Sequence, residues 1–185
     1  MKQFILSVLF IITICINTKA QLTHSISLGP ELSIPGKNFG KSNLGFGGSF
    51  EYMVKFNAPV GIQFHFGYSG FPNKFYSNSK ISFLPVRLGL VGFIYQDLIF
   101  VSADAGISHY HSPSTVTDQN GFSFGAGGGY KLFFDPEKKQ FVQLSAYFNM
   151  HNFRNDTFGQ NYNYGWFNIR AAYGLSWGKK IKTED

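Results

Sequence analysis

One short stretch of the chain carries the residue types of a hydrolase. His109, His111 and Ser112 lie close together, and Asp118 follows a little further on. A histidine beside a serine and an acid can activate the serine hydroxyl, and a His-x-His pair on one strand face can bind a metal ion. A triad also needs hydrogen-bond geometry, which spacing does not supply, and the sequence offers no evident third metal ligand. We therefore expect a polar loop here, with no catalytic residue, no metal and no cofactor.

A second set of chemistry-bearing residues is spread along the chain at positions that alternate with apolar side chains. It contains three acids, three bases and one histidine: Glu31, Glu51, His65, Arg87, Asp104, Lys131 and Arg170. An isolated charge removed from water is costly, so buried charges have to be paired. The balance of acids and bases favours a structural ion-pair network over the alternative, a proton or ion path.

Two pairs within this set are expected to be neighbours. The tight turn at 96–97 would place Arg87 and Asp104 in adjacent or diagonal positions of one hairpin, about 5 to 8 Å apart at Cβ. Arg170 belongs to the last segment of the chain and Glu31 to the first. These two should face each other if the sheet closes on itself.

All of these residues sit on a pattern of period two that begins after residue 23. Apolar side chains occupy one parity, and Gly, Ser, Asn, Gln or charged residues the other, which is typical of β-strands. No stretch of comparable length shows helical spacing with capping residues. The pattern divides into eight segments, at 24–34, 43–56, 59–70, 80–95, 98–109, 121–133, 140–151 and 164–177. The sequence therefore predicts an all-β chain.

The connections between these segments alternate in length. Those after even-numbered segments are tight and those after odd-numbered segments are longer. The tight ones are 57–58, 96–97 and 135–139, and the longer ones are 35–42, 71–79, 110–120 and 152–163. An antiparallel meander puts the two groups at opposite ends, as in bacterial outer-membrane barrels with short periplasmic turns and longer outer loops. Glu51 and Lys131 both lie toward the short-turn end, although their spacing does not establish a contact.

The two parities predict which face meets lipid. The apolar parity carries no Asp, Glu, Lys or Arg in any of the eight segments. A lipid-facing Arg or Lys near the bilayer midplane costs roughly 2 to 4 kcal/mol, so this exclusion indicates a lipid-facing surface. Gly and Ser dominate the other parity, as expected for an eight-stranded barrel whose interior is just wide enough for side chains to fill. We predict an eight-stranded antiparallel up-and-down transmembrane β-barrel.

Aromatic residues and two prolines add detail to this prediction. Aromatics near the segment ends are expected to form interfacial girdles. They are Phe56, Tyr95, Phe134, Phe141 and Trp177 at the short-turn end and Phe46, Tyr68, Phe71, Phe122, Tyr164 and Trp166 at the other end. Pro30 and Pro85 lie inside segments, where a missing N–H predicts local breaks or bulges in the ladder.

The N-terminus has the features of a cleaved secretory signal. Lys2 supplies a positive start, 4–16 is an apolar run, and Thr18 and Ala20 form a small-x-small cleavage site. A membrane anchor is the alternative, but spanning a bilayer takes about 20 apolar residues and this run is shorter. We therefore expect residues 1–20 to be a signal peptide that is removed on export.

The remaining chain is long enough for one domain. We expect an outer-membrane barrel at 21–178 and a short periplasmic tail at 179–185. Cys15 is the only cysteine and would leave with the signal, which excludes disulfides, thiolate metal sites and cysteine nucleophiles. The glycine-rich stretch 125–129 lacks the helix and lysine of a phosphate-binding loop, and the basic tail is offset by two acids at its end. No nucleic-acid partner is expected.

The chain resembles the small outer-membrane β-barrel domain proteins of Gram-negative envelopes. Its architecture is similar to the transmembrane part of outer membrane protein A. Its pattern of residue types along the strands is similar to that of PorT-type barrels. The residues that carry the resemblance are Ala20-Gln21, Ser27-Leu28-Gly29-Pro30-Glu31-Leu32, Phe83-Leu84-Pro85-Val86-Arg87-Leu88-Gly89 and Gly125-Ala126-Gly127-Gly128-Gly129-Tyr130. The resemblance implies a location in the outer membrane. In such proteins an aromatic residue usually ends the last strand and the chain, whereas here Trp177 is followed by further residues.

These observations lead to three hypotheses of function. The first is a non-enzymatic barrel with a plugged, salt-bridged lumen, in contact with outer-membrane lipids, whose long loops present a surface to an envelope or extracellular protein partner. The second is an outer-membrane lipid-modifying hydrolase that uses His109, His111 and Ser112. The third is a soluble periplasmic barrel that binds an apolar ligand in its interior. Fold analogy does not decide among them, and we favour the first.

Overall fold

The structure is a computed structural model that describes residues 22–36, 39, 42–72, 80–95, 97–112, 119–155 and 160–178. The predicted signal at 1–20 and the predicted tail at 179–185 lie outside these residues. Eight strands are present: β1 (Thr23–Pro35), β2 (Gly45–Lys55), β3 (Val60–Pro72), β4 (Lys80–Ile94), β5 (Ile99–His111), β6 (Gln119–Phe133), β7 (Gln140–Asn155) and β8 (Gln160–Gly178). Within the described part of the chain, no helix is both long and apolar enough to cross a membrane.

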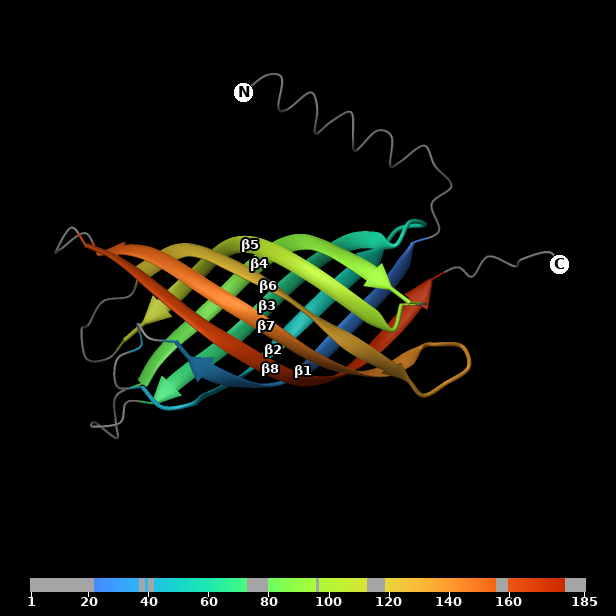
Figure 1. Cartoon of the computed structure of the whole chain (residues 1–185), viewed down its shortest axis with the longest axis horizontal. Coiled ribbons are helices and arrows are strands. Elements are labelled where there is room, and N and C mark those ends of the chain that lie inside the picture. Colours follow the sequence, from blue (N-terminus) through green and yellow to red (C-terminus); the bar gives the residue numbers. More distant parts are fainter. Residues whose placement is uncertain are drawn as a thin grey trace, which may run out of the picture.

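The strands form a closed barrel in chain order. Each strand pairs antiparallel with the next, and β8 returns to pair with β1, so that Thr23 lies opposite Gly178. The chain therefore enters and leaves the barrel at the end that carries the short turns (Figure 1). This confirms the predicted eight-stranded up-and-down barrel.

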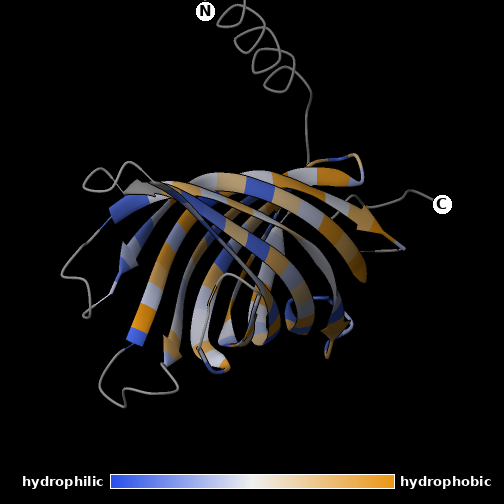
Figure 2. Cartoon of the chain, turned by 60° about the vertical axis from the view of Figure 1, so that its left-hand side comes forward, coloured by the Kyte–Doolittle hydropathy of each residue, from blue (hydrophilic) through white to orange (hydrophobic). Residues whose placement is uncertain are grey.

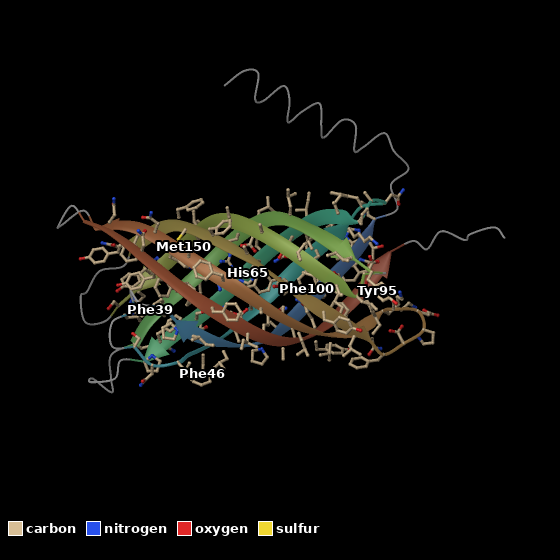
Figure 3. All side chains as sticks on the ribbon, viewed as in Figure 1. Phe39, Phe46, His65, Tyr95, Phe100 and Met150 are labelled. Carbon is tan, nitrogen blue, oxygen red and sulfur yellow. The ribbon has the colours of Figure 1, made fainter. Side chains whose placement is uncertain are left out.

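The faces of the barrel follow the predicted parity. Leu90 points outward and is 72% exposed, whereas Arg87 on the same strand points inward and is 1% exposed. Hydrophobic and hydrophilic bands alternate along the strands accordingly (Figure 2). In Figure 3, Phe46 projects away from the barrel wall, while His65 lies within it. The hypothesis of a soluble barrel with an apolar ligand interior is wrong, because the aliphatic side chains cover the outside and charged groups occupy the lumen.

The two prolines interrupt hydrogen bonding on one side each. The β1–β8 pairing skips Gly29 and Pro30, and the β3–β4 pairing skips Pro85, yet the register is the same on both sides of each gap. The other neighbour pairs through both prolines without interruption. The expectation of breaks or bulges is therefore confirmed in the form of breaks, because a missing N–H removes a bond toward one neighbour without adding a residue.

The last hairpin is longer than the sequence pattern predicts. β7 continues to Asn155 and β8 begins at Gln160, so most of the expected loop at 152–163 is paired strand. Asn152 pairs with Asn163 in this extension. In this extension the alternation is reversed: Asn152, Asn161 and Asn163 are exposed, whereas Phe153 and Tyr162 pack inward. The apolar outward parity that defines the predicted segments therefore stops before the strands do.

The aromatic girdles are smaller than expected. Tyr95, Phe134 and Trp177 are exposed on the outside at the short-turn end, as are Phe46, Tyr68 and Phe122 toward the loop end. Four of the expected girdle residues instead face the lumen: Phe71, Phe141 and Trp166 are buried, and Tyr164 is partly buried against other lumen aromatics. Their parity is inward, and closeness to a strand end does not change the face on which a side chain projects.

Candidate functional site

The middle of the lumen is organised around the Arg170 guanidinium. Arg170 Nη1 lies 2.9 Å from Glu51 Oε2, and Arg170 Nε lies 3.9 Å from Glu31 Oε1. The second terminal nitrogen donates to the carbonyl and hydroxyl oxygens of Ser27, both at 3.1 Å, and to the Ser49 carbonyl at 3.3 Å. A guanidinium presents five donors in a planar fork, so one arginine can serve two acids and two strands at once.

Neutral donors complete the coordination of both carboxylates. The Ser49 hydroxyl and the Asn168 amide donate to Glu31 at 2.5 and 2.6 Å. The Gln143 amide donates to Glu51 at 2.7 Å. Since an unpaired buried carboxylate is costly, these hydrogen bonds allow two acids to share one arginine in a site that water does not reach.

A second ion pair lies across the lumen, on the β4–β5 side of the barrel. Arg87 Nε is 2.9 Å from Asp104 Oδ1, and Arg87 Nη1 donates to Asn149 Oδ1 at 2.7 Å. Arg87 pairs in register with Gly106 and Asp104 with Gly89, so the ion pair runs diagonally across the β4–β5 hairpin. This is the geometry expected from the short turn.

The glycine-rich parity makes room for this pair. A Cβ atom built on Gly125 would collide with the Asp104 carboxylate and would lie 2.8 Å from two atoms of the Arg87 guanidinium. Gly125 lies directly opposite Asp104 in the β5–β6 ladder, and a narrow eight-stranded lumen has room for two long charged side chains there only because this neighbour is bare backbone. The glycine at position 125 is thus part of the charged site.

The remaining predicted network residues take different positions. His65 Nδ1 is 3.5 Å from Glu51 Oε1, and the ring is buried, so it borders the central pair. Lys131 donates to the Ser25 hydroxyl at 3.2 Å and stands apart from the other charges near the short-turn end. Glu51 and Lys131 form no ion pair within the described residues. The structure thus brings six of the seven predicted residues into the middle of the lumen and leaves Lys131 outside that group.

Two aromatic layers that the sequence analysis missed flank the charged centre. Toward the loop end, one layer contains Phe39, Phe71, Phe83, Tyr110, Phe153 and Trp166. Toward the short-turn end, a second layer contains Met53, Val91, Phe93, Phe100 and Tyr147. Figure 3 shows Phe39 at the loop end of the barrel and Phe100 on the other side of His65. Applying the strand parity to the aromatic residues as well as to the polar ones would have placed these rings in the lumen, except for Phe39, which lies between β1 and β2.

The rings of the loop-end layer pack against each other, some edge to face and others stacked. The Phe39 and Phe71 centroids are 4.4 Å apart, and those of Phe83 and Trp166 are 4.8 Å apart. His151 stacks on Trp166 at 4.4 Å and 10°, which joins this layer to the polar centre below it. Such contacts are favourable aromatic geometries, and they fill the cross-section with side chains that have few degrees of freedom.

The hydrolase residues do not share a face. His109 and His111 project outward from β5, and His109 Nδ1 lies 2.9 Å from Asn120 Oδ1. Ser112 is buried on the inner side. Asp118 lies outside the described residues. Across the residues that the structure does describe, no three His, Cys, Asp or Glu side chains are grouped as a metal site requires.

Comparison with known proteins supports the assignment of the fold. No protein-family profile and no curated protein sequence matches the chain. The crystal structure of Neisserial surface protein A (NspA) superposes with a TM-score of 0.61 at 12% identity, covering 82% of this chain and 96% of that one. Ail, the attachment invasion locus protein of Yersinia pestis, gives 0.56 at 18% identity, covering 83% and 98%. OprG, an outer membrane protein of Pseudomonas aeruginosa, gives 0.50 at 11% identity, covering 85% and 96%.

These similarities define a class of fold. The chain has the fold of the small eight-stranded outer-membrane β-barrels, which confirms the resemblance stated from its motifs. At identities below one in five residues, the shared property is the architecture. Fold alone does not carry a function.

Proposed function

We propose that this protein is a non-conducting integral protein of the outer membrane that acts as a structural or interaction protein of the envelope. It is exported by a cleaved signal peptide at residues 1–20. The barrel anchors the chain in the lipid, and the connections at the loop end face outside the cell and meet a protein partner. No cofactor is required for this role.

The observation that carries the proposal is the filling of the lumen at three successive levels. A large, fully buried side chain stands at each level: Trp166 toward the loops, Arg170 in the middle and Phe100 toward the short turns. The central charges are engaged with each other and with amides and hydroxyls. A pore needs a continuous wet path, and a large buried side chain at each level of so narrow a barrel supports a lumen without one.

The outer surface and the similar structures support the proposed location and partners. Leucine, valine, isoleucine and phenylalanine dominate the exposed outer face, which suits acyl chains. Two of the similar structures are named as a surface protein and as an attachment invasion locus protein. A role at the cell surface, played by the loop end, is consistent with those names. The opposite faces taken by Ser112 and the two histidines of β5 disfavour the hydrolase hypothesis.

Planar-bilayer recording on the purified full-length protein tests the proposal. The closed lumen predicts no large, steady single-channel conductance after insertion. As a control, the same preparation is run on a gel with and without heating. Heat-modifiable mobility shows that the barrel in the preparation is closed. A large and steady conductance from heat-modifiable protein would overturn the proposal.

A further inference from the structure

The short-turn end of the barrel contains a hollow that the network does not fill. Its volume is about 650 Å³, and its rim includes the β2–β3, β4–β5 and β6–β7 turns together with Gly178, the last residue of β8. This is within the usual size range of small-molecule sites, which are concave and mainly apolar with a few placed polar groups. We call this hollow the vestibule.

Lys131 is the charged group at the inner side of the vestibule. It lines the hollow although its side chain is only 4% exposed. Its ammonium lies 4.8 Å from the centre of the Phe141 ring, 5.4 Å from that of Phe93 and 5.7 Å from that of Phe100. The three rings hold the cation in place by cation–π attraction. The ammonium has three donors, and the hydroxyl of Ser25 accepts from one of them.

Lys131 differs from the two arginines of the lumen because no carboxylate in the described part of the chain lies close to its ammonium. Arg170 and Arg87 each have a carboxylate within 3 Å. Among the described residues, Lys131 has none within 4 Å. The two acids at the rim of the vestibule are already paired, Asp97 with Lys55 and Glu137 with Lys139. A buried ammonium without a counter-ion is costly in a medium of low dielectric constant, so the site favours an anion.

We propose that the vestibule binds a small organic anion: a carboxylate, carried on an apolar body, that pairs with the Lys131 ammonium. The carboxylate takes the donors that the protein leaves open. Phe93 and Phe133 have inward parity, line the vestibule and provide apolar contact for the body of the ligand. The rim carries three lysines against two acids, and this excess of positive charge attracts anions toward the opening. This binding is separate from the proposed role of the loops at the opposite end, and either can fail without the other.

Titration of the full-length protein with phenylacetate tests this site. The protein is held in lauryldimethylamine oxide micelles, which bring no carboxylate or phosphate, and amide shifts are followed by NMR. We expect saturable shifts at Ser25 and Phe93. Phenylacetamide has the same apolar body without the charge, and it should bind about tenfold or more weakly, as expected for loss of a hydrogen bond to a charged group.

Substitution of Lys131 distinguishes binding in the vestibule from nonspecific binding of phenylacetate elsewhere on the protein. Lys131→Met keeps the length of the side chain and removes the charge, and it should weaken phenylacetate binding by about tenfold or more. Lys80→Met is the matched control, since Lys80 begins β4 at the opposite end of the barrel, and it should leave binding unchanged. Ser25→Ala keeps the ammonium and frees one more donor, so it should bind at least as tightly as the natural chain.

Three outcomes of these binding experiments would overturn the proposal. Equal binding of phenylacetate and phenylacetamide, or binding to Lys131→Met within a factor of two of the natural chain, would overturn the proposal. Absence of saturable shifts in the natural protein would overturn it as well. Heat-modifiable mobility of each variant shows that the barrel is closed before binding is measured. Because Lys131→Met removes an unpaired buried charge, we expect it to fold.

Discussion

Arg170 lies opposite Glu31 in the β1–β8 ladder, yet its shorter ion pair is with Glu51, which belongs to β2. The two nitrogen–oxygen distances are 3.9 and 2.9 Å. The arginine side chain therefore reaches past its neighbouring strand to the next one, which is possible because the lumen is narrow. One guanidinium thus compensates two buried carboxylates and links three strands at the point where the barrel closes.

The first prediction concerns the loss of this guanidinium. Arg170→Met would leave Glu31 and Glu51 buried without their cation. We expect the free energy of unfolding to fall by about 3 to 5 kcal/mol, the usual cost of breaking a buried ion pair on one side. Urea unfolding of the protein in lipid vesicles, followed by gel mobility, measures this change.

A double variant provides the control for this prediction. Arg170→Met combined with Glu51→Gln removes one of the two stranded charges and should recover part of the lost stability. If the single variant loses less than about 1 kcal/mol, the scale of an exposed pair, the central charges are not buried together as described.

The second prediction concerns the lipid face. Leu88 projects outward near the middle of β4, and Ile94 projects outward at its end. Leu88→Arg should destabilise the inserted barrel by roughly 2 to 4 kcal/mol, whereas Ile94→Arg should cost about 0 to 1 kcal/mol, because the penalty depends on depth in the bilayer. Unfolding titrations of both variants in vesicles give the comparison. Equal and small effects would place both residues in water.

The sequence predicted the barrel wall well because one physical condition acts along every strand. Where one face meets lipid and the other a packed lumen, the two parities must differ, as at Leu90 and Arg87. In the last hairpin that condition ends and the alternation is reversed. Asn152 and Asn163 pair on the outer face, while Phe153 and Tyr162 lie inward, so the extension has no apolar outward parity from which its length could be predicted.

The contacts within the lumen were predictable only between neighbouring strands. A short turn fixes the register of a hairpin, which is why Arg87 and Asp104 could be placed together. The Glu51–Arg170 contact crosses an intervening strand, and it depends on how far the barrel is sheared and on side-chain rotamers. The inward position of Trp166 was available from parity, but its closeness to a strand end suggested a girdle.

The third prediction concerns the seam where β1 meets β8. A Cβ atom on Gly29 would collide with the Ala171 carbonyl and approach the Cα of Ala172 to 2.5 Å. Gly29→Ala should therefore lower the free energy of unfolding by about 1 to 3 kcal/mol, as overpacking usually does. The control is Gly92→Ala, whose Cβ would meet only Val101, at 3.5 and 3.9 Å, and which should leave stability unchanged or raise it. Equal losses in the two unfolding titrations would contradict this account of the seam.

The fourth prediction concerns the β6–β7 turn, which lies outside the membrane-spanning part. The Asp135 carboxylate accepts from the backbone N–H of Gln140 at 2.8 Å and of Lys139 at 2.9 and 3.0 Å. These hydrogen bonds hold the pKa of Asp135 below its usual value. The unfolded chain then binds a proton more readily, so the stabilising effect is present above about pH 4 and is lost as the pH falls through the lower folded pKa.

An NMR pH titration of the Asp135 carboxyl carbon in the folded protein checks this direction. The midpoint should lie below that of the same residue in a short unfolded peptide of residues 133–141. Asp135→Asn should abolish the pH dependence that this turn contributes. A midpoint equal to that of the peptide would mean that the turn hydrogen bonds do not form in solution.

The orientation of the side chains is the central claim, and the chain contains two tryptophans that report it directly. Trp177 faces outward and is 45% exposed, whereas Trp166 faces the lumen and is 1% exposed. Trp166→Phe and Trp177→Phe each leave one of them as the only fluorophore. In vesicles of lipids brominated near the headgroup end of their acyl chains, we predict strong quenching of Trp177 and weak quenching of Trp166. Strong quenching of Trp166 with little effect on Trp177 would contradict the account.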